Sequence, residues 1–534
     1  MSQRATNRPV LIALVIFIAL GAPRAGIGQD HKHEHDEREK AGSYSLLNNL
    51  GDHHFSITTT NARAQEFFDQ GLRLYYGFNH AEAIKSFAEA QRLDPSCAMC
   101  YWGEALAYGP NINMPMDQDG AQAASVAIEV ASSLKDKSSP LEQQLIGALQ
   151  ERYRRTDADE RSDLDESYAT SMHRVRMDYP DNVEVAVLHA EAVMTTMPWD
   201  YWNKDQTPKP EFEKALGSLR FAMESNPNHP GACHFYIHGV EKYFPEMAVE
   251  CAERLAALMP GAGHIVHMPG HIYIRVGRYD DAIRANQHAV HADETYIQDR
   301  RPGVGVYTAG YYPHNYDFMA FAASMIGDCD LAVEAANNVR NVIPQEVIGQ
   351  PGFEFLQHYY TRPVQMLVGC NRWDEILNYD QPDETLEYAN LIWHYARGRA
   401  LAATGDLPAA QVELGFLEEA RTTGKFVGVT IEPNTADQII AIAEQVLAGW
   451  IASASGQQEA AIQHMRKGVL LEDGLLYGEP PEWSVPVRHD LGAMQLAHND
   501  LSGAEKTFRE ALQKFPNNEP SLAGLNLAQE GQSR

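Results

Sequence analysis

From Asn61 onward, apolar residues recur every three or four positions along nearly the whole chain. This spacing places them on one face of an α-helix, whereas the strict alternation that marks a half-buried strand is almost absent. Polar stretches rich in Gly and Pro interrupt the pattern near residues 109–121, 199–210, 300–311 and 422–436. The pattern therefore predicts an all-α chain of many consecutive helices, with irregular connections at these four places.

Small and large residues also recur at fixed places within successive stretches of about 34 residues. The first copy contains Phe67, Gly71, Leu74, Ala83, Phe87, Ala90 and Pro95. The same frame returns around Gly270, Gly398, Gly449 and Gly492. These positions resemble the tetratricopeptide (TPR) repeat, a pair of antiparallel helices. The resemblance implies an α-solenoid, a right-handed superhelix of roughly ten TPR-like helix pairs, whose first helices line a concave groove that binds proteins or peptides.

Three further blocks strengthen this resemblance. They are FNHAEA at 78–83, CAMCYWG at 97–103 and HMPGHIY at 267–273. The blocks are similar to those of a family of exported bacterial TPR proteins whose function is poorly defined. The resemblance thus supports the architecture and adds little about chemistry.

The first residues are typical of a secretory signal. Arg4 and Arg8 precede an apolar run at 10–20 and then several small residues. We expect a signal peptide at 1–28, an exported chain (periplasmic or extracellular), and no membrane span after signal removal. Further segments are a His-rich disordered leader (29–60), N-terminal repeats (61–130), an irregular TPR-like segment (131–229), central repeats (230–346), a TPR-like segment (347–434) and C-terminal repeats (435–534).

Charge and cysteine usage narrow the possible functions. The net charge of −29 without a Lys/Arg cluster argues against a nucleic-acid partner and is compatible with cations. Six cysteines in a chain of 534 residues do not make a disulfide scaffold. Cys97 and Cys100 form a close pair at the start of a helix, which favours either a disulfide or a soft-metal site. The other four, scattered through helical patterns, are predicted to be small buried residues.

Two histidine pairs stand out against this background. His234 with His238, and His267 with His271, have the i, i+4 spacing that puts two imidazoles on one helix face. His267 follows His234 by 33 residues, and His271 follows His238 by the same 33, close to one repeat. The TPR frame, with His264 and His314 added, implies six histidines on one wall of the groove: His234, His238, His264, His267, His271 and His314.

Imidazole is the commonest protein ligand of zinc and copper, so these six residues are the candidate metal ligands. The alternative is a groove for a peptide or small ligand, lined by the histidines and by neighbouring aromatic or acidic side chains. The candidate groove residues are Tyr236, Tyr273, Tyr312 and Asp317. Asp317, one turn after His314, could also be a metal ligand or orient an imidazole.

The sequence therefore predicts an exported TPR scaffold that binds copper or zinc, or a partner peptide, and that otherwise needs no cofactor. No metalloprotease, phosphate-loop or nucleophile-elbow motif is present in the sequence. The alternative function is a metal-dependent enzyme at the same histidines, for which Glu241 is the nearest candidate base.

Overall fold

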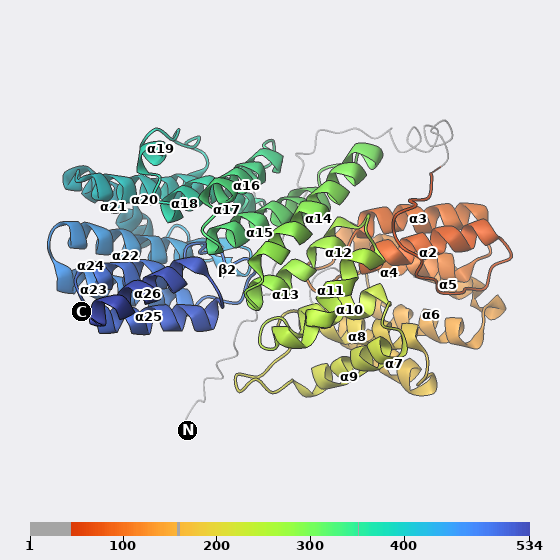
Figure 1. Cartoon of the computed structure of the whole chain (residues 1–534). Helices are drawn as coiled ribbons and strands as arrows, with labels where there is room; N and C mark the ends of the chain where they lie inside the picture. Colours follow the sequence, from red (N-terminus) through yellow and green to blue (C-terminus); the bar gives the residue numbers. More distant parts are fainter. Residues whose placement is uncertain (1–43, 157–160, 351, 534) are drawn as a thin grey trace, which may run out of the picture. The chain divides into compact units, whose positions relative to one another are not determined.

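The computed structural model describes residues 44–156, 161–350 and 352–533 (Figure 1). The described chain divides into two compact units. The N-terminal unit comprises residues 44–239 and 257–265, and the C-terminal unit comprises residues 240–256 and 266–533. The expected signal peptide at 1–28 lies outside the described residues.

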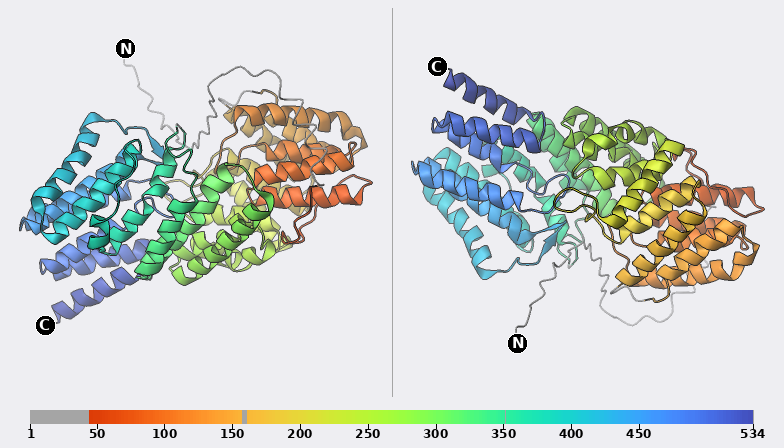
Figure 2. Two further views of the ribbon diagram at one scale, coloured as in Figure 1. Left: turned by 90° about the horizontal axis from the view of Figure 1, so that it is seen from above. Right: turned by 90° about the horizontal axis from the view of Figure 1, so that it is seen from below.

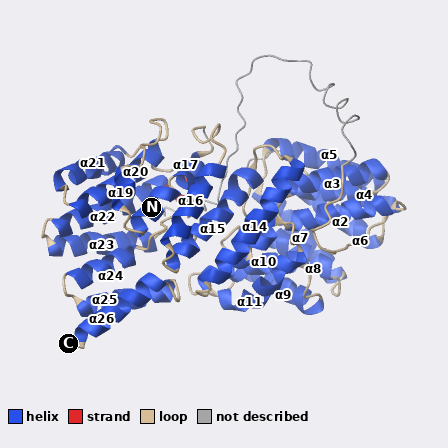
Figure 3. Cartoon of the chain, turned by 45° about the horizontal axis from the view of Figure 1, so that its top comes forward, coloured by secondary structure: helices blue, strands red, loops and turns tan. Residues whose placement is uncertain are grey.

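The predicted all-α class is confirmed: the described residues are overwhelmingly helical (Figure 3). The first helices are α2 (Ala62–Tyr76), α3 (His80–Leu93), α4 (Ala98–Ala107), α5 (Gln118–Leu134), α6 (Pro140–Arg152), α7 (Ser162–Asp178), α8 (Val183–Thr195), α9 (Pro210–Ser225) and α10 (Pro230–Val240). The short helices α11 (Val249–Leu258) and α12 (Gly263–His267) follow, and the boundary between the units passes through both.

The C-terminal unit continues in the same manner. Its helices are α13 (Pro269–Arg275), α14 (Tyr279–Arg300), α15 (Tyr312–Met325), α16 (Cys329–Val342), α17 (Glu354–Tyr360), α18 (Arg362–Gly369), α19 (Trp373–Leu377), α20 (Glu387–Thr404), α21 (Leu407–Thr423), α22 (Ala436–Ala454), α23 (Gln458–Asp473), α24 (Val487–Ala497), α25 (Leu501–Lys514) and α26 (Glu519–Gln532). A two-stranded hairpin, β1 (Thr430–Ile431) and β2 (Asn434–Thr435), occupies one of the expected irregular connections.

Helices that follow one another along the chain pack as TPR-like pairs, as with α2 and α3 or α22 and α23 (Figure 2). Glycine makes the close packing possible. A Cβ atom on Gly71 or on Gly103 would lie 2.7 or 2.4 Å from the ring of Phe87, so both helices approach this ring at positions where only glycine fits. Gly492 and Gly524 approach Phe508 in the same way in the last repeat. The repeat positions read from the sequence are therefore the positions of closest helix contact.

Residues 44–60 were predicted to belong to a disordered leader, and for this stretch the prediction is wrong. The segment has no helix or strand, but it is anchored to α2 and α3. The Tyr44 hydroxyl donates to a Glu82 carboxylate oxygen at 2.7 Å, and the Leu47 backbone N–H donates to the Gln70 side chain at 2.6 Å. Leu50 is fully buried. The sequence of this segment is polar and has no helical or strand periodicity, so these contacts could not be predicted from it.

The cysteines form more cross-links than expected. Cys97 and Cys100 are joined in a disulfide at the start of α4, so this pair is not a soft-metal site in the structure. Cys329 and Cys370 form a second disulfide, which corrects the prediction that they serve only as small buried residues. Their Cα atoms lie 5.7 Å apart because α16 begins beside the end of α18, a meeting that the helical pattern alone does not reveal.

None of the described helices combines the length and the apolar character needed to cross a membrane.

Candidate metal centres

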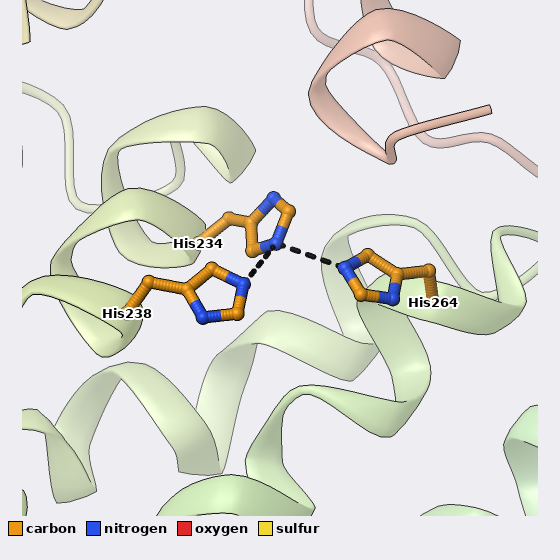
Figure 4. A group of neighbouring side chains, drawn as sticks. All are labelled: His234, His238 and His264. Carbon is orange, nitrogen blue, oxygen red and sulfur yellow. Dashed lines mark hydrogen bonds between the residues drawn. The ribbon is translucent and has the colours of Figure 1, made fainter. Parts of the chain in front are cut away.

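The first group of three histidines lies in the N-terminal unit (Figure 4). His234 and His238 come from one face of α10, and His264 comes from α12. The Nε2 atom of His234 lies 3.1 Å from Nε2 of His238 and 3.2 Å from Nε2 of His264. All three side chains are buried. We call this group the first triad.

The orientation of His234 is set by a backbone contact. Its Nδ1 atom lies 2.7 Å from the carbonyl oxygen of Tyr76, which can only accept a hydrogen bond. Nδ1 must therefore carry a proton, and the neutral ring then has its lone pair on Nε2, the atom that faces the other two imidazoles. The rings of Phe78 and Trp199 pack against the triad, with centroids 4.4 Å from His234 and 5.2 Å from His238 respectively.

The second triad lies in the C-terminal unit and consists of His267, His271 and His314. The Nε2 atoms of His267 and His271 are 2.9 Å apart. The ring of His314, on α15, lies 5.0 Å from that of His267 and 5.9 Å from that of His271. His314 is half-buried, whereas the other two side chains are buried. Each histidine offers one nitrogen that lies within 4.8 Å of those of the other two.

Three polar side chains orient the second triad. His267 Nδ1 lies 2.6 Å from Asn286 Oδ1, and the Asn286 amide nitrogen donates to the Ala282 carbonyl, which fixes Oδ1 as the acceptor. His271 Nδ1 lies 2.9 Å from a carboxylate oxygen of Glu479 and 3.3 Å from one of Glu241. Both Nδ1 atoms are therefore donors, and both Nε2 atoms direct lone pairs toward each other.

Two facing lone pairs 2.9 Å apart repel each other unless a proton or a metal ion lies between them. The pKa of His271 reflects this environment. Burial lowers it, but the carboxylates of Glu241 and Glu479 outweigh burial and raise it to about 10. Without metal, a proton is therefore held on the pair, and a metal ion would take its place.

The nitrogen spacings are close to those of a coordinated ion. With Zn–N bonds of about 2.0–2.1 Å, a tetrahedral ion holds two ligand nitrogens about 3.3 Å apart. The contacts of 3.1 and 3.2 Å in the first triad approach this spacing, and the 2.9 Å contact in the second triad requires a small widening. The hydrogen bonds at Nδ1 orient His234, His267 and His271 for this role, whereas His314 would have to move closer to its two partners to complete the second site.

A further group, His53, Glu184 and His229, has a different character. His229 Nδ1 accepts a hydrogen bond from the Ala232 backbone N–H at the start of α10, so in the neutral ring the Nε2 atom carries the proton. This Nε2 lies 3.2 Å from Glu184, which also accepts from the Tyr76 hydroxyl. Burial raises the pKa of Glu184, but His53 and His229 outweigh burial and lower it. The group is therefore a hydrogen-bonded carboxylate network, not a set of lone pairs facing one another.

The structure thus gathers the six predicted histidines into two triads, each within one unit. Five of the six are buried, so they do not form the solvent-lined groove wall expected from the repeat frame. Tyr236 is buried, Tyr273 stacks with Arg278, and the Tyr312 hydroxyl donates to Glu294. Asp317 does not contact an imidazole in the structure; it accepts a hydrogen bond from Arg362 at 2.8 Å. Its expected roles as ligand or direct orienting partner are corrected accordingly.

Sequence reasoning missed two orienting residues, Asn286 and Glu479. Asn286 lies on α14, the helix that pairs with α13, and the repeat frame could have placed it near His267. Glu479 is 208 residues from His271 and lies in an irregular loop, so no local pattern points to it. Glu241, considered only as a base near His238, also lies beside His271.

No protein-family model matches the chain, and no curated protein matches it. Among solved structures, human IFIT1 in a dimer with m7Gppp-AAAA is 13% identical, with coverage of 90% of this chain and 92% of that chain and a TM-score of 0.33. Yeast Tom70 is 11% identical, with coverage of 89% and 90% and a TM-score of 0.29. Cut9, from the APC/C hetero-tetramer Cut9–Hcn1, is 12% identical, with coverage of 87% and 76% and a TM-score of 0.32.

Proposed function

We propose that the protein is an exported TPR-like scaffold that binds a transition-metal ion, copper or zinc, at each of its two histidine triads. The observation that carries the proposal is the arrangement in the second triad. His267 and His271 both use Nδ1 as a hydrogen-bond donor, so their Nε2 atoms face each other across 2.9 Å, where they can share either a proton or a metal ion. Imidazole nitrogens with the other nitrogen held by a carboxylate or carbonyl are the usual ligands of zinc and copper in proteins.

Burial favours metal binding over a peptide-binding role for these histidines. A peptide can reach only exposed side chains, but His234 and His267 are fully buried and His238, His264 and His271 nearly so. A small ion can occupy a buried site that a peptide cannot enter. The peptide-binding role expected of a TPR scaffold therefore belongs to other surfaces of the repeats.

Export is supported by the signal-like N-terminus and by the disulfides Cys97–Cys100 and Cys329–Cys370, which persist in oxidising compartments. Fractionation of cells that express the full chain tests this part. We expect the protein outside the cytoplasm, with a mature N-terminus near residue 29. Retention of the full-length chain in the cytoplasm would contradict it.

To test metal binding, the full-length chain is expressed, and the exported protein is purified without added metal. We expect elemental analysis to find copper or zinc near one ion per triad, and the same ions to return when stripped protein is titrated. Replacing His234 and His267 together with Ala should abolish binding.

Matched control variants are His173→Ala and His464→Ala. Each removes a partly buried imidazole that lies outside the triads, in one unit and the other. We expect both variants to retain the metal. A correctly folded wild-type protein that contains no metal and takes up neither Zn²⁺, Cu²⁺ nor Cu⁺ would overturn the proposal. A cobalt-substituted sample whose spectrum shows an exchangeable water ligand would instead favour the metal-dependent enzyme.

A further inference from the structure

The loop between α23 and α24, residues 474–486, is long and irregular, and most of its residues from Glu479 onward are buried. Its residues Glu482, Trp483 and Ser484 are 1%, 4% and 2% exposed. Connecting loops usually run over the surface because their backbone groups need water. A buried loop therefore needs specific polar partners, and those of this loop lead to the second triad along two routes.

The first route is direct. One Glu479 oxygen accepts from His271 Nδ1 at 2.9 Å, and the other accepts from the Tyr477 hydroxyl in the same loop. The Arg275 guanidinium lies 3.5 Å from this second oxygen. Both carboxylate oxygens are thus engaged, so the carboxylate has a fixed orientation. It holds the Nδ1 proton of His271 and places negative charge beside a ring that is a candidate metal ligand.

The second route passes through Arg362, which is fully buried. Its guanidinium donates to the Glu482 carbonyl at 2.9 Å, to the Ser484 hydroxyl, and to Asp317 at 2.8 Å. Ser484 in turn donates to Gln365 at 3.1 Å, which attaches the loop to α18. Asp317 is one helical turn after His314 on α15. The loop and the helix that carries His314 are therefore joined by one buried arginine.

Such an arrangement is rigid for energetic reasons. A buried guanidinium is costly unless its charge is paired, and loss of Asp317 would leave the charge of Arg362 uncompensated in the interior. The loop, α15 and α18 therefore keep one arrangement as long as Arg362 keeps its contacts.

We propose that this loop is part of the second metal centre. Glu479 orients His271 and places a negative charge beside its ring. Glu482 and Ser484 bind Arg362, which binds Asp317 and so positions the helix that carries His314. This inference rests on the proposed metal binding. It assigns the orientation of His271 and the position of His314 to residues of the 474–486 loop. Glu479 and Asp317 are positioning residues, because neither is a metal ligand itself.

The test is made in a His234→Ala background, so that only the second triad takes up metal. Glu479→Gln retains an acceptor for His271 Nδ1–H and removes the charge, and we expect Zn²⁺ affinity to fall about tenfold. Glu479→Leu removes the nearer acceptor as well and leaves only Glu241, at 3.3 Å, for His271 Nδ1, so we expect a larger loss than for Glu479→Gln, up to about 100-fold. Both variants should also shift the visible spectrum of bound Co²⁺, because the orientation and basicity of one ligand change.

The matched control is Glu472→Gln. Glu472 is a buried carboxyl near the end of α23, just before the loop begins. It accepts a hydrogen bond from the backbone N–H of Val487, just after the loop ends, rather than from an imidazole. We expect this variant to change thermal stability but to leave Zn²⁺ affinity and the Co²⁺ spectrum unchanged. Asp317→Asn should weaken Zn²⁺ binding less than Glu479→Gln, since it acts only through Arg362.

The same titrations distinguish a failure of the loop inference from a failure of the proposed metal binding. If the His234→Ala protein binds Zn²⁺ and Glu479→Gln binds it as tightly as Glu472→Gln does, the inference about the loop is overturned. If the wild-type chain takes up no metal, the proposed function itself fails.

Discussion

A ring nitrogen of histidine can bind a metal ion only when the proton of the ring rests on the other nitrogen. In this protein three different acceptors hold that proton: the Tyr76 carbonyl, the Asn286 side chain and the Glu479 carboxylate. The nitrogen of His229, by contrast, accepts a backbone N–H, so its group is excluded from the candidate metal centres. At the scale of single residues, the hydrogen-bond partner therefore separates a candidate metal ligand from a structural histidine.

Asn286 provides a direct test of this rule. In Asn286→Leu, His267 loses the acceptor for its Nδ1 proton, and we expect metal affinity at the second triad to fall about 10- to 100-fold. Asn286→Asp keeps an acceptor for His267 but turns a carboxylate oxygen toward the Ala282 carbonyl, so we expect lower thermal stability with a metal affinity closer to wild type than that of Asn286→Leu. Competition titration with a chelator measures both. Equal affinities for the two variants would contradict the role assigned to Asn286.

Asp293 predicts a dependence of stability on pH that is independent of metal. Burial raises its pKa to about 7, although the Tyr307 hydroxyl and the Asn315 amide donate to it. The folded state therefore holds a proton that the unfolded state releases above pH ~4. Its stabilising contribution is complete below that pH and is lost as pH rises toward 7.

Asp293→Asn removes this ionisation while keeping the size of the side chain and one acceptor oxygen, which can still accept from Asn315. Relative to wild type, the variant should gain a few kcal/mol of stability between pH 4.5 and pH 8. Urea unfolding of both proteins at the two pH values measures the difference. A stability difference that is the same at both values would show that Asp293 does not titrate as described.

The two histidine pairs could be predicted from the sequence, because i, i+4 spacing and the repeat step are both local periodicities, and the TPR frame added His264 and His314. Their burial could not. The repeat frame states which helix face a residue occupies, but aromatic rings such as Phe78 and Trp199, which come from connections between helices, cover that face.

At the scale of elements, helix pairing follows from where glycine and phenylalanine lie, and this is why the fold class could be predicted so fully. Gly71 and Gly103 meet Phe87, and Gly492 and Gly524 meet Phe508, so the repeat signature is itself a list of helix contacts. Connections carry no such signature. The anchored segment 44–60 and the buried loop 474–486 both depend on contacts distant in sequence, which periodicity does not encode.

The Cys329–Cys370 disulfide links two such elements, the start of α16 and the residue that follows α18. It closes a loop with a sequence separation of 41 residues. A cross-link of this length stabilises by about 4 kcal/mol if it acts through the entropy of the unfolded chain. The double variant Cys329→Ser/Cys370→Ser should therefore unfold at a clearly lower temperature than wild type.

Replacing Cys97 and Cys100 provides the comparison, since that disulfide closes a loop with a separation of only three residues and should stabilise less. Thermal unfolding followed by circular dichroism measures both variants. An unfolding temperature that falls more for the Cys97/Cys100 variant than for the Cys329/Cys370 variant would contradict the loop-length argument.

At the scale of the whole molecule, the chain consists of two units, and each contains one triad. Its net charge of −29 raises the concentration of cations near the surface, and salt screens this effect. The triads themselves bring together residues from separate helices, and His271 of the second is hydrogen-bonded to Glu479, 208 residues further along the chain. A bound ion should therefore stabilise the folded state of the unit that holds it, rather than one helix alone.

Amide hydrogen exchange can resolve this stabilisation by unit. An ion at 100 times its dissociation constant stabilises a folded state by about 2.7 kcal/mol, which slows exchange through unfolding about 100-fold. With metal present, we expect slower exchange in α10 of the N-terminal unit and in α13, α15 and the 474–486 loop of the C-terminal unit. His234→Ala should remove the protection of α10 alone, and His271→Ala that of the C-terminal segments alone. If either single variant removes protection from both units, the two triads do not bind independently.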